Sequence, residues 1–217
     1  RDVPGRSLDH GLRHARERTL SAEEIRLFWN GLETADLTDA VRVCLRLILL
    51  TAQRPGEICG MARDELDLAT GWWTIPGARA KNGNPQRVPL PAWAAELLGP
   101  HLPAPDAERA ALFTRVRGQA IAVTALSHAL RRNYAAFGVA DFTPHDLRRT
   151  AASHMTALGI PRLVVSKILN HAERGVTAIY DRHSYDAEKR QALEAWARRL
   201  RVIIAGTPAS NVVAFAR

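Results

Sequence analysis

The stretch T-P-H-D-L-R-R-T, residues 143–150, opens the helix around which the rest of the chain is interpreted. A Thr at the N-cap followed by Pro144 at the first helical position is typical of a helix start, so we expect a helix from here to about Leu158. His145 and Arg148 stand three residues apart, and one face of that helix therefore carries both side chains. Imidazole and guanidinium groups, combined with a phenol, are the groups that a protein would bring together to act on a phosphate.

The segment that follows supplies a second imidazole and a phenol. After an apolar run, residues 168–185 are I-L-N-H-A-E-R-G-V-T-A-I-Y-D-R-H-S-Y, so that Tyr180 follows His171 by nine residues. Pro161 predicts the start of a helix that ends near Leu169, and a short helix is expected over 176–181. The two segments together predict a phosphate site in the carboxy-terminal half of the chain.

The composition fits a folded basic protein with a polyanionic partner. The 217 residues are enough for one sizeable domain, the net charge is +8 and the sequence pI is about 10.4. Only three of the thirty basic residues are Lys (Lys81, Lys167 and Lys189), so a Lys in a special position is conspicuous. A merely soluble basic protein is the alternative that charge leaves open.

The cysteines favour a reducing compartment such as the cytoplasm. Cys44 and Cys59 are too few for a disulfide framework and do not form a metal-ligand spacing. No stretch approaches the roughly 18 apolar residues that a membrane span requires. We therefore expect no metal, no cofactor and no membrane partner.

The fold class predicted from periodicity is mainly α with a small antiparallel sheet (α+β). The apolar run V-R-V-C-L-R-L-I-L-L marks residues 39–52 as a buried central helix, and Asn82-Gly83 is a hairpin-type turn signal. Further helices are expected over 21–33, 55–61, 92–98, 123–137 and 186–204, and strands over 65–68, 72–75 and 86–90. Residues 21–204 would form one domain, with 1–20 a charged linker entering it and 205–217 a tail.

Five pieces of sequence, in order, resemble the catalytic domain of the tyrosine recombinases, the phage-integrase family. They are T-A-Q-R-P-G-E at 51–57, K-N-G-N-P-Q-R-V-P-L at 81–90, H-D-L-R at 145–148, L-N-H at 169–171, and Tyr180. The resemblance covers nearly all of residues 21–200, and the closing I-Y-D-R-H-S-Y is most similar to integrases of temperate phages and genomic islands. Ala52 and Asn170 depart from the family wording, in which Gly is frequent at both positions.

The resemblance implies a role for each residue of the set. Tyr180 would attack the phosphate, Arg54 and Arg148 would hold its non-bridging oxygens, and His171 would donate a hydrogen bond to it. His145 would carry the proton of the nucleophile, Lys81 would protonate the leaving 5′ oxygen, and Glu57 would orient Arg54. Taken singly, each residue also has a structural explanation: a surface salt bridge, a solvated turn residue or a helix N-terminal acid.

Two further choices remain at this stage. Of the three tyrosines, Tyr134 falls within an expected amphipathic helix and Tyr185 precedes the last helix, so the spacing from His171 favours Tyr180. An Arg surplus over 109–149 makes Arg115, Arg117, Arg131 and Arg132 candidate DNA phosphate contacts, although a solvated helix face explains each one equally well.

The implied function is site-specific recombination of double-stranded DNA through a 3′-phosphotyrosine intermediate. A homotetramer on the attachment sites is expected, with a monomer as the alternative for this fragment, which we expect to bind DNA weakly. The resemblance also implies that residues 21–204 are the catalytic domain, that 1–20 are a linker from an amino-terminal DNA-binding region, and that the protein acts on DNA in the bacterial cytoplasm. The tail over 205–217 would be exchanged between protomers, pack against its own sheet or stay unpacked. Strand relaxation of the type IB topoisomerase kind and a non-catalytic DNA-binding regulator remain the alternatives.

Overall fold

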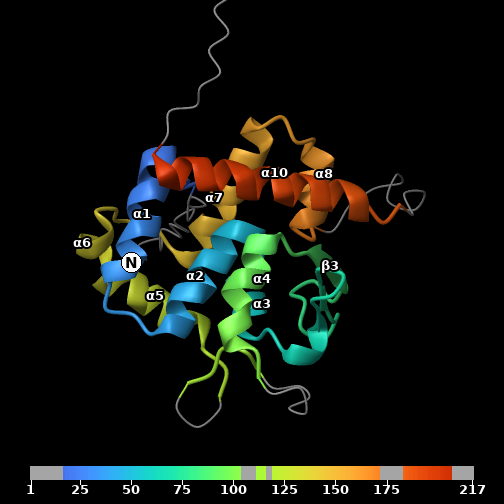
Figure 1. Cartoon of the computed structure of the whole chain (residues 1–217), viewed down its shortest axis with the longest axis horizontal. Coiled ribbons are helices and arrows are strands. Elements are labelled where there is room, and N and C mark those ends of the chain that lie inside the picture. Colours follow the sequence, from blue (N-terminus) through green and yellow to red (C-terminus); the bar gives the residue numbers. More distant parts are fainter. Residues whose placement is uncertain (1–16, 104–110, 116–118, 172–182, 207–217) are drawn as a thin grey trace, which may run out of the picture.

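A computed structural model describes residues 17–103, 111–115, 119–171 and 183–206 of the chain. It confirms a mainly helical fold with one small antiparallel sheet (Figure 1). The helices are α1 (Ala22–Thr34), α2 (Asp39–Thr51), α3 (Pro55–Cys59), α4 (Ala92–Leu98), α5 (Val123–Arg132), α6 (Tyr134–Phe137), α7 (Pro144–Ala157), α8 (Arg162–Ile168) and α10 (Asp186–Ala205). The strands are β1 (Leu66–Asp67), β2 (Trp72–Ile75) and β3 (Gln86–Pro89), with 3₁₀ turns at Arg63–Glu65 and Gly99–His101.

Helix α2 is the buried centre of the molecule, as its sequence predicts. Every residue from Val43 to Thr51 is buried, and the Thr38 side chain caps the helix by accepting from the Val41 N–H. The helix packs against α7, α4, α3, α5 and α10. Because α2 contacts most of the other helices, the residues at its carboxyl end lie where several elements meet.

Helix α10 crosses the molecule and joins its two sides (Figure 1). It contacts α1 at one end and α8 and β3 at the other, with α2 and α7 between them. Trp196 is fully buried, and its indole N–H donates to the Leu49 carbonyl of α2 over 2.9 Å. The long helix thus fixes the sheet relative to the helical part.

The sheet has the order β1-β2-β3, and Trp73 is paired with Val88 across β2 and β3. The Trp73 ring is buried, and its N–H donates to Glu65 over 2.9 Å. The preceding Trp72 carries the guanidinium of Arg87 4.2 Å from the centre of its ring. The sheet is therefore anchored to the core through one tryptophan and covered by cationic side chains at the other.

One expected helix is wrong in its extent. The apolar pattern predicts a single helix over 123–137, but the structure divides it at Asn133, which has φ −111° and ψ 11°. The Asn133 amide donates to Asp36 O and accepts from Asp36 N, and this tie to the α1–α2 connection competes with helical geometry. The expected short helix over 176–181 lies outside the described residues.

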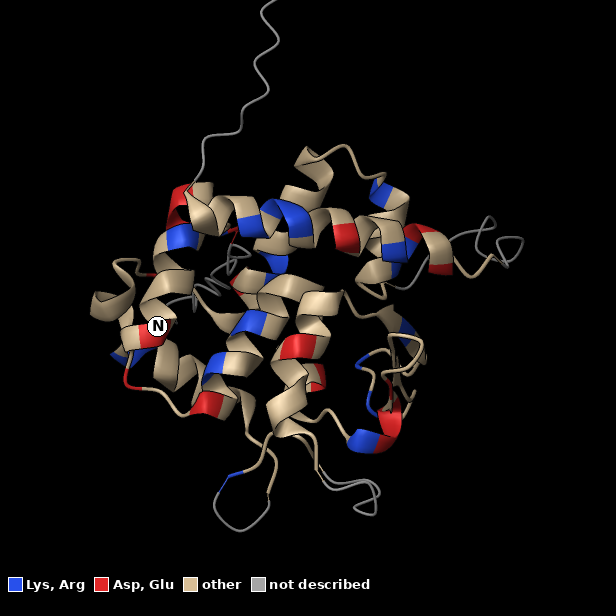
Figure 2. Ribbon diagram, in the orientation of Figure 1, with Lys and Arg blue, Asp and Glu red and all other residues tan. Residues whose placement is uncertain are grey.

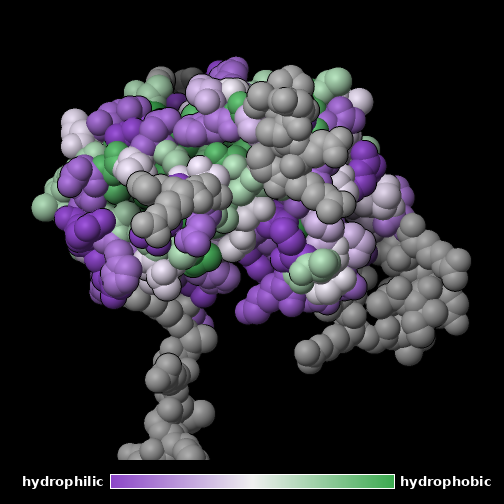
Figure 3. Space-filling model, turned by 90° about the horizontal axis from the view of Figure 1, so that it is seen from below, coloured by the Kyte–Doolittle hydropathy of each residue, from purple (hydrophilic) through white to green (hydrophobic). Residues whose placement is uncertain are grey.

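The surface of the described residues carries charges of both signs. Figure 2 shows Lys and Arg recurring on α10, on α2 and around the sheet, with acidic residues between them. Seen from below, most of the coloured surface is hydrophilic, with small apolar patches (Figure 3). Among the described helices, none is both long and apolar enough to cross a membrane.

We predict that Gly77→Ala destabilises the β2–β3 hairpin. A Cβ at Gly77 would lie 2.5 Å from the Gly83 carbonyl oxygen, so the backbone at the tip must move, at a cost of about 1–3 kcal/mol. Chemical denaturation measures this loss. Gly99→Ala is the matched control, because nothing lies within 4 Å of that position, and its free energy of unfolding should be unchanged or slightly higher. Equal effects of the two substitutions would contradict the tight approach.

Candidate active site

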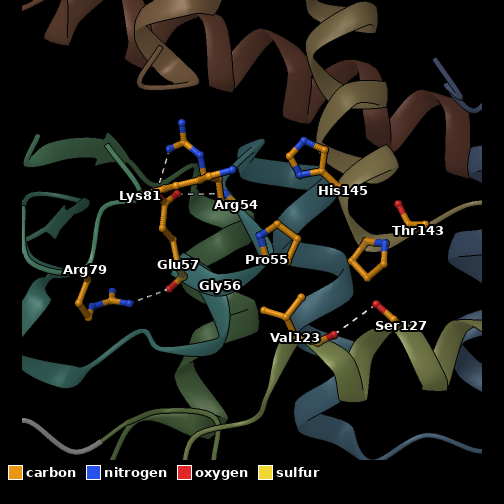
Figure 4. A pocket seen from close by; sticks show the side chains of 11 residues that line it. Arg54, Pro55, Gly56, Glu57, Arg79, Lys81, Val123, Ser127, Thr143 and His145 are labelled. Atoms are coloured by element: carbon orange, nitrogen blue, oxygen red, sulfur yellow. Dashed lines mark hydrogen bonds and ion pairs between the residues drawn. The ribbon is translucent and has the colours of Figure 1, made fainter. Parts of the chain in front are cut away.

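A cavity of about 320 Å³ opens where α3, the β2–β3 hairpin, α5 and α7 meet (Figure 4). Arg54 and Lys81 lie beside Glu57 at one side of this cavity, and His145 lies across from them. The cavity is lined by Arg54, Pro55, Gly56, Glu57, Arg79, Lys81, Val123, Ser127, Thr143, Pro144 and His145. Residues separated by about 90 positions in the sequence therefore face one space.

Arg54 is held from two directions at the start of α3. Its Nη1 donates to Glu57 Oε1 over 2.9 Å, and its Nη2 donates to the Asn170 carbonyl over 3.2 Å. Glu57 is 2% exposed, and its second oxygen accepts from the Arg54 backbone N–H. The same Glu57 carboxylate thus forms an ion pair with Arg54 and caps the first turn of α3, the contacts that an orienting role would use.

Arg148 lies deeper, with only 3% of its surface exposed. Its two terminal nitrogens donate to the carbonyls of Ala52 over 2.7 Å and of Leu169 over 2.6 Å. Burial and the nearby Arg54 charge lower the pKa of Arg148 to about 9, so the guanidinium stays charged at pH 7. The charges that act on Arg148 come from Arg54 and from Glu57, so among the described residues two guanidiniums face a single carboxylate and leave a positive site that favours an anion.

The carboxyl end of α8 is bound by side chains from three other parts of the chain. Amide groups of Gln53 and Gln86 both donate to the Ile168 carbonyl, over 3.0 and 2.6 Å. The next carbonyls accept from Arg148 and from Arg54, as described above. We call this set, the carbonyls of residues 168–170, the carbonyl row; it fixes the backbone immediately before His171.

Ala52 and Asn170, the two residues that stand where the family frequently has Gly, both adopt an unusual backbone conformation. Ala52 has φ 57° and Asn170 has φ 47°, the left-handed region in which Gly is least strained. Each residue ends a helix and offers its carbonyl to a buried or half-buried arginine. The local geometry that Gly favours is therefore kept with other residues.

The imidazoles of His145 and His171 both lie close to the arginines. Partial burial, followed by the charges of Arg148 and Arg149, lowers the pKa of His145. Partial burial, followed by Arg148 and Arg54, lowers the pKa of His171. Both rings are therefore neutral at pH 7 in the free protein, and a neutral imidazole is able to accept a proton.

The hairpin that carries Lys81 is braced by Arg79. The Arg79 guanidinium donates to both oxygens of Glu65, over 2.6 and 2.5 Å, and to the Glu57 backbone carbonyl over 3.2 Å. Lys81 itself is exposed at the mouth of the cavity. Arg79 thus joins the hairpin to the helix that holds Arg54.

The structure brings together five of the predicted residues: Arg54, Lys81, His145, Arg148 and His171. Tyr180 and Arg117 lie outside the described residues. Tyr134 donates its hydroxyl to the Phe142 carbonyl over 2.6 Å, and the Tyr185 ring lies 4.6 Å from the Lys167 ammonium.

The candidate DNA contacts lie apart from the cavity. Arg115, Arg131 and Arg132 are exposed, and two of them, Arg115 and Arg132, line a wider groove between α5 and the α1–α2 connection.

Sequence reasoning missed the residues that support the site, namely Gln53, Arg79, Asn82 and Gln86. Their hydrogen-bond partners are mostly backbone carbonyls or carboxylates far away in the sequence, so no characteristic residue spacing marks these side chains. The one available signal was Asn170, which stands where Gly is frequent.

The arrangement provides cationic donors for a phosphate, neutral imidazoles and an ammonium. Within the described ranges, no group of three or more His, Cys, Asp or Glu side chains is placed to hold a metal ion.

Comparison with known proteins gives consistent matches. The profile of the phage integrase family matches residues 18–187. The prophage integrase IntA of Escherichia coli is 25% identical over 87% of this chain, and the tyrosine recombinase XerC of Mycobacterium bovis is 32% identical over 64% of it. The chain spans about half the length of these relatives, 46% and 48%.

Solved structures share the fold. The integrase from mycobacterium phage Brujita has a TM-score of 0.62 at 18% identity, covering 88% of this chain and 65% of its own. A lambda integrase dimer bound to a COC′ core site has a TM-score of 0.57 at 20% identity, covering 72% of this chain and 58% of its own.

We predict that Arg54→Ala destabilises the protein by about 3 kcal/mol, because it leaves the buried Glu57 carboxylate without its counter-charge. Adding Glu57→Gln should recover most of that loss, since Gln removes the charge and can still accept from the backbone N–H of residue 54. Denaturant unfolding of the single and double variants measures both effects. A double variant no more stable than Arg54→Ala would show that the ion pair is not what Arg54 contributes.

We predict that the His145 ring titrates below its ordinary pKa of about 6.5 in the DNA-free protein. Removing the proton is favoured by partial burial and by the neighbouring positive charges, so the ring is neutral above that midpoint and charged only at lower pH. NMR titration of the ring protons measures the midpoint, and the His145→Gln spectrum assigns the signal. A midpoint above 6.5 would contradict the described surroundings.

Proposed function

The chain belongs to the phage integrase family, and on that premise we propose that it is a tyrosine-type site-specific recombinase that cleaves and rejoins double-stranded DNA. The observation that carries the proposal is the cationic cavity that Arg54, Lys81 and His145 line, with the Arg148 guanidinium buried close to Arg54 and His145. Three separate segments supply these four groups, because His145 and Arg148 share α7. The buried Glu57 carboxylate pairs with Arg54, and its charge also acts on Arg148. Such a site suits a phosphodiester whose charge grows during attack.

Tyr180 is the nucleophile in this proposal. Its hydroxyl oxygen attacks the scissile phosphorus and forms a 3′-phosphotyrosine, while the bond from phosphorus to the 5′ oxygen breaks. The hydroxyl proton passes to the neutral His145 ring, which helps because a free Tyr has a pKa near 10. Tyr134 is the poorer candidate, because its hydroxyl already donates to the backbone carbonyl of Phe142.

Lys81 completes the first step by giving a proton to the leaving 5′ oxygen. An ammonium is able to release a proton and a guanidinium is not, which is a reason for Lys at this position in an Arg-rich chain. In the second step a 5′ hydroxyl of a partner strand attacks the phosphotyrosine, and the same groups act in reverse. Arg54, Arg148 and His171 hold the non-bridging oxygens in both steps.

The DNA partner is proposed as a duplex contacted mainly through its backbone. Exposed arginines on and near α5 (Arg115, Arg131, Arg132) are candidate phosphate contacts, as is Arg117. A homotetramer on paired sites, a linker over 1–20 and a tail over 205–217 exchanged between protomers belong to the same proposal.

The direct test is a covalent adduct on a nicked suicide duplex whose binding site is selected from a random library. We predict that the wild-type chain gives a detergent-resistant protein–DNA band, that Tyr180→Phe abolishes it, and that the control Tyr185→Phe retains it. No band from the wild type would favour a non-catalytic DNA-binding regulator. A band that survives Tyr180→Phe and disappears with Tyr185→Phe would move the nucleophile to Tyr185. Relaxation of a supercoiled plasmid without strand exchange would favour the topoisomerase alternative.

A further inference from the structure

The tip of the β2–β3 hairpin is joined to the end of α8 by two asparagine side chains. The Asn82 amide donates to the Asn170 carbonyl over 2.9 Å, and the Asn170 amide donates to Asn82 Oδ1 over 3.3 Å and to the Asn84 carbonyl over 3.1 Å. We call these three hydrogen bonds the amide latch. It connects residues 88 positions apart in the sequence.

The hairpin tip has little else to hold it. Lys81, Gly83, Asn84 and Pro85 are all exposed, so no side chain of the tip after the buried Ala80 enters the core. Gln86, at the base of β3, donates to the Ile168 carbonyl over 2.6 Å and anchors the strand rather than the tip. The position of Lys81 therefore depends largely on the latch and on the Arg79 brace before it.

The backbone conformation of Asn170 indicates that its side chain has a role of its own in binding the hairpin. With φ 47° the position favours Gly, and Asn is among the residues that tolerate this region best. A Gly would serve the backbone alone, whereas the Asn amide makes two hydrogen bonds to the hairpin. The Asn170 carbonyl also accepts from Arg54, so one residue contacts both the hairpin and an arginine of the cavity.

We propose that Asn82 and Asn170 are positioning residues for Lys81. The amide latch holds the residue next to Lys81 against the Arg54 side of the cavity, and so sets where the ammonium meets the leaving oxygen. This inference rests on the proposed function, because it assigns a task to the hairpin within the cleavage step. Loss of the latch weakens protonation of the leaving group and leaves the attack by the nucleophile intact.

The test compares two substrates for each variant of the chain. One is an ordinary nicked duplex, and the other has sulfur in place of the bridging 5′ oxygen at the scissile phosphate. A thiol has a pKa of roughly 8.5, so the thiolate leaves without a proton from the protein, whereas the alkoxide needs one. The ratio of cleavage rates on the two substrates reports leaving-group protonation separately from folding and DNA binding.

We expect Asn170→Gly to slow cleavage of the ordinary substrate by about 10- to 100-fold, a part of the roughly 10²- to 10⁴-fold that a general acid contributes. Cleavage of the sulfur substrate should stay within about twofold of wild type. Gly keeps the left-handed backbone, so the fold is retained, and the variant loses the two bonds that the Asn170 amide donates. Asn82→Ala loses the two latch bonds of the Asn82 side chain, one of them shared with Asn170→Gly, and should behave alike. Asn84→Ala is the matched control, because that residue contributes only its backbone to the latch.

The outcomes separate the latch from the proposed function. Equal slowing on both substrates by Asn170→Gly and Asn82→Ala would overturn the positioning role, as would no slowing on either. A wild-type chain that cleaves neither substrate would overturn the proposed function itself, and the latch proposal with it.

Discussion

The Arg148 guanidinium is the interaction on which the site depends. It lies almost wholly inside the protein and donates to one carbonyl at the end of α2 and to another just beyond α8. Helix α7, which carries Arg148 and His145, is thereby tied to the two chain segments that lead into Arg54 and His171. Placing a charge there costs solvation, and hydrogen bonds to two helix-end carbonyls, which carry partial negative charge, offset part of that cost.

The same arrangement explains why the cavity is suited to an anion. Helix-end carbonyls hold the arginines in place but neutralise little of their charge, and in the described part of the chain Glu57 is the carboxylate that pairs with Arg54 and acts on Arg148. The site therefore keeps a surplus of positive charge in a partly dry space, where an incoming phosphate gains more than it would at an open surface. In the proposed function, structural support and phosphate binding would use different hydrogens of the same guanidinium groups.

Local sequence signals predicted most of the helices and strands, and also which side chains share one face of a helix. The start of α7 is an example: Thr143 and Asp146 form the capping box and Pro144 takes the first helical position, which places His145 and Arg148 on one face. The five-part resemblance then predicted that Arg54 and Lys81 would join them. Capping signals span only a few residues, and the family motifs occur in a fixed order along the chain. Both kinds of signal can therefore be recognised in a single sequence.

The interactions that were not predicted join distant segments through the backbone. Asn133 ends a helix early because it binds Asp36, 97 positions away, and the carbonyl row accepts from side chains up to 116 positions away. A backbone carbonyl looks the same in every residue, so no sequence pattern marks it as an acceptor. Ala52 and Asn170 were visible as departures, but their meaning appears only with the left-handed angles that both adopt.

The most direct test of the central role of Arg148 is hydrogen exchange of the Arg148→Met variant, followed by mass spectrometry. Met keeps an unbranched apolar side chain and removes both hydrogen bonds to the carbonyls. We predict faster exchange in two separate segments, residues 50–57 and 166–171, while the sheet and the centre of α10 keep their protection. Faster exchange confined to α7 would contradict the account, because Arg148 would then not be what ties those segments together.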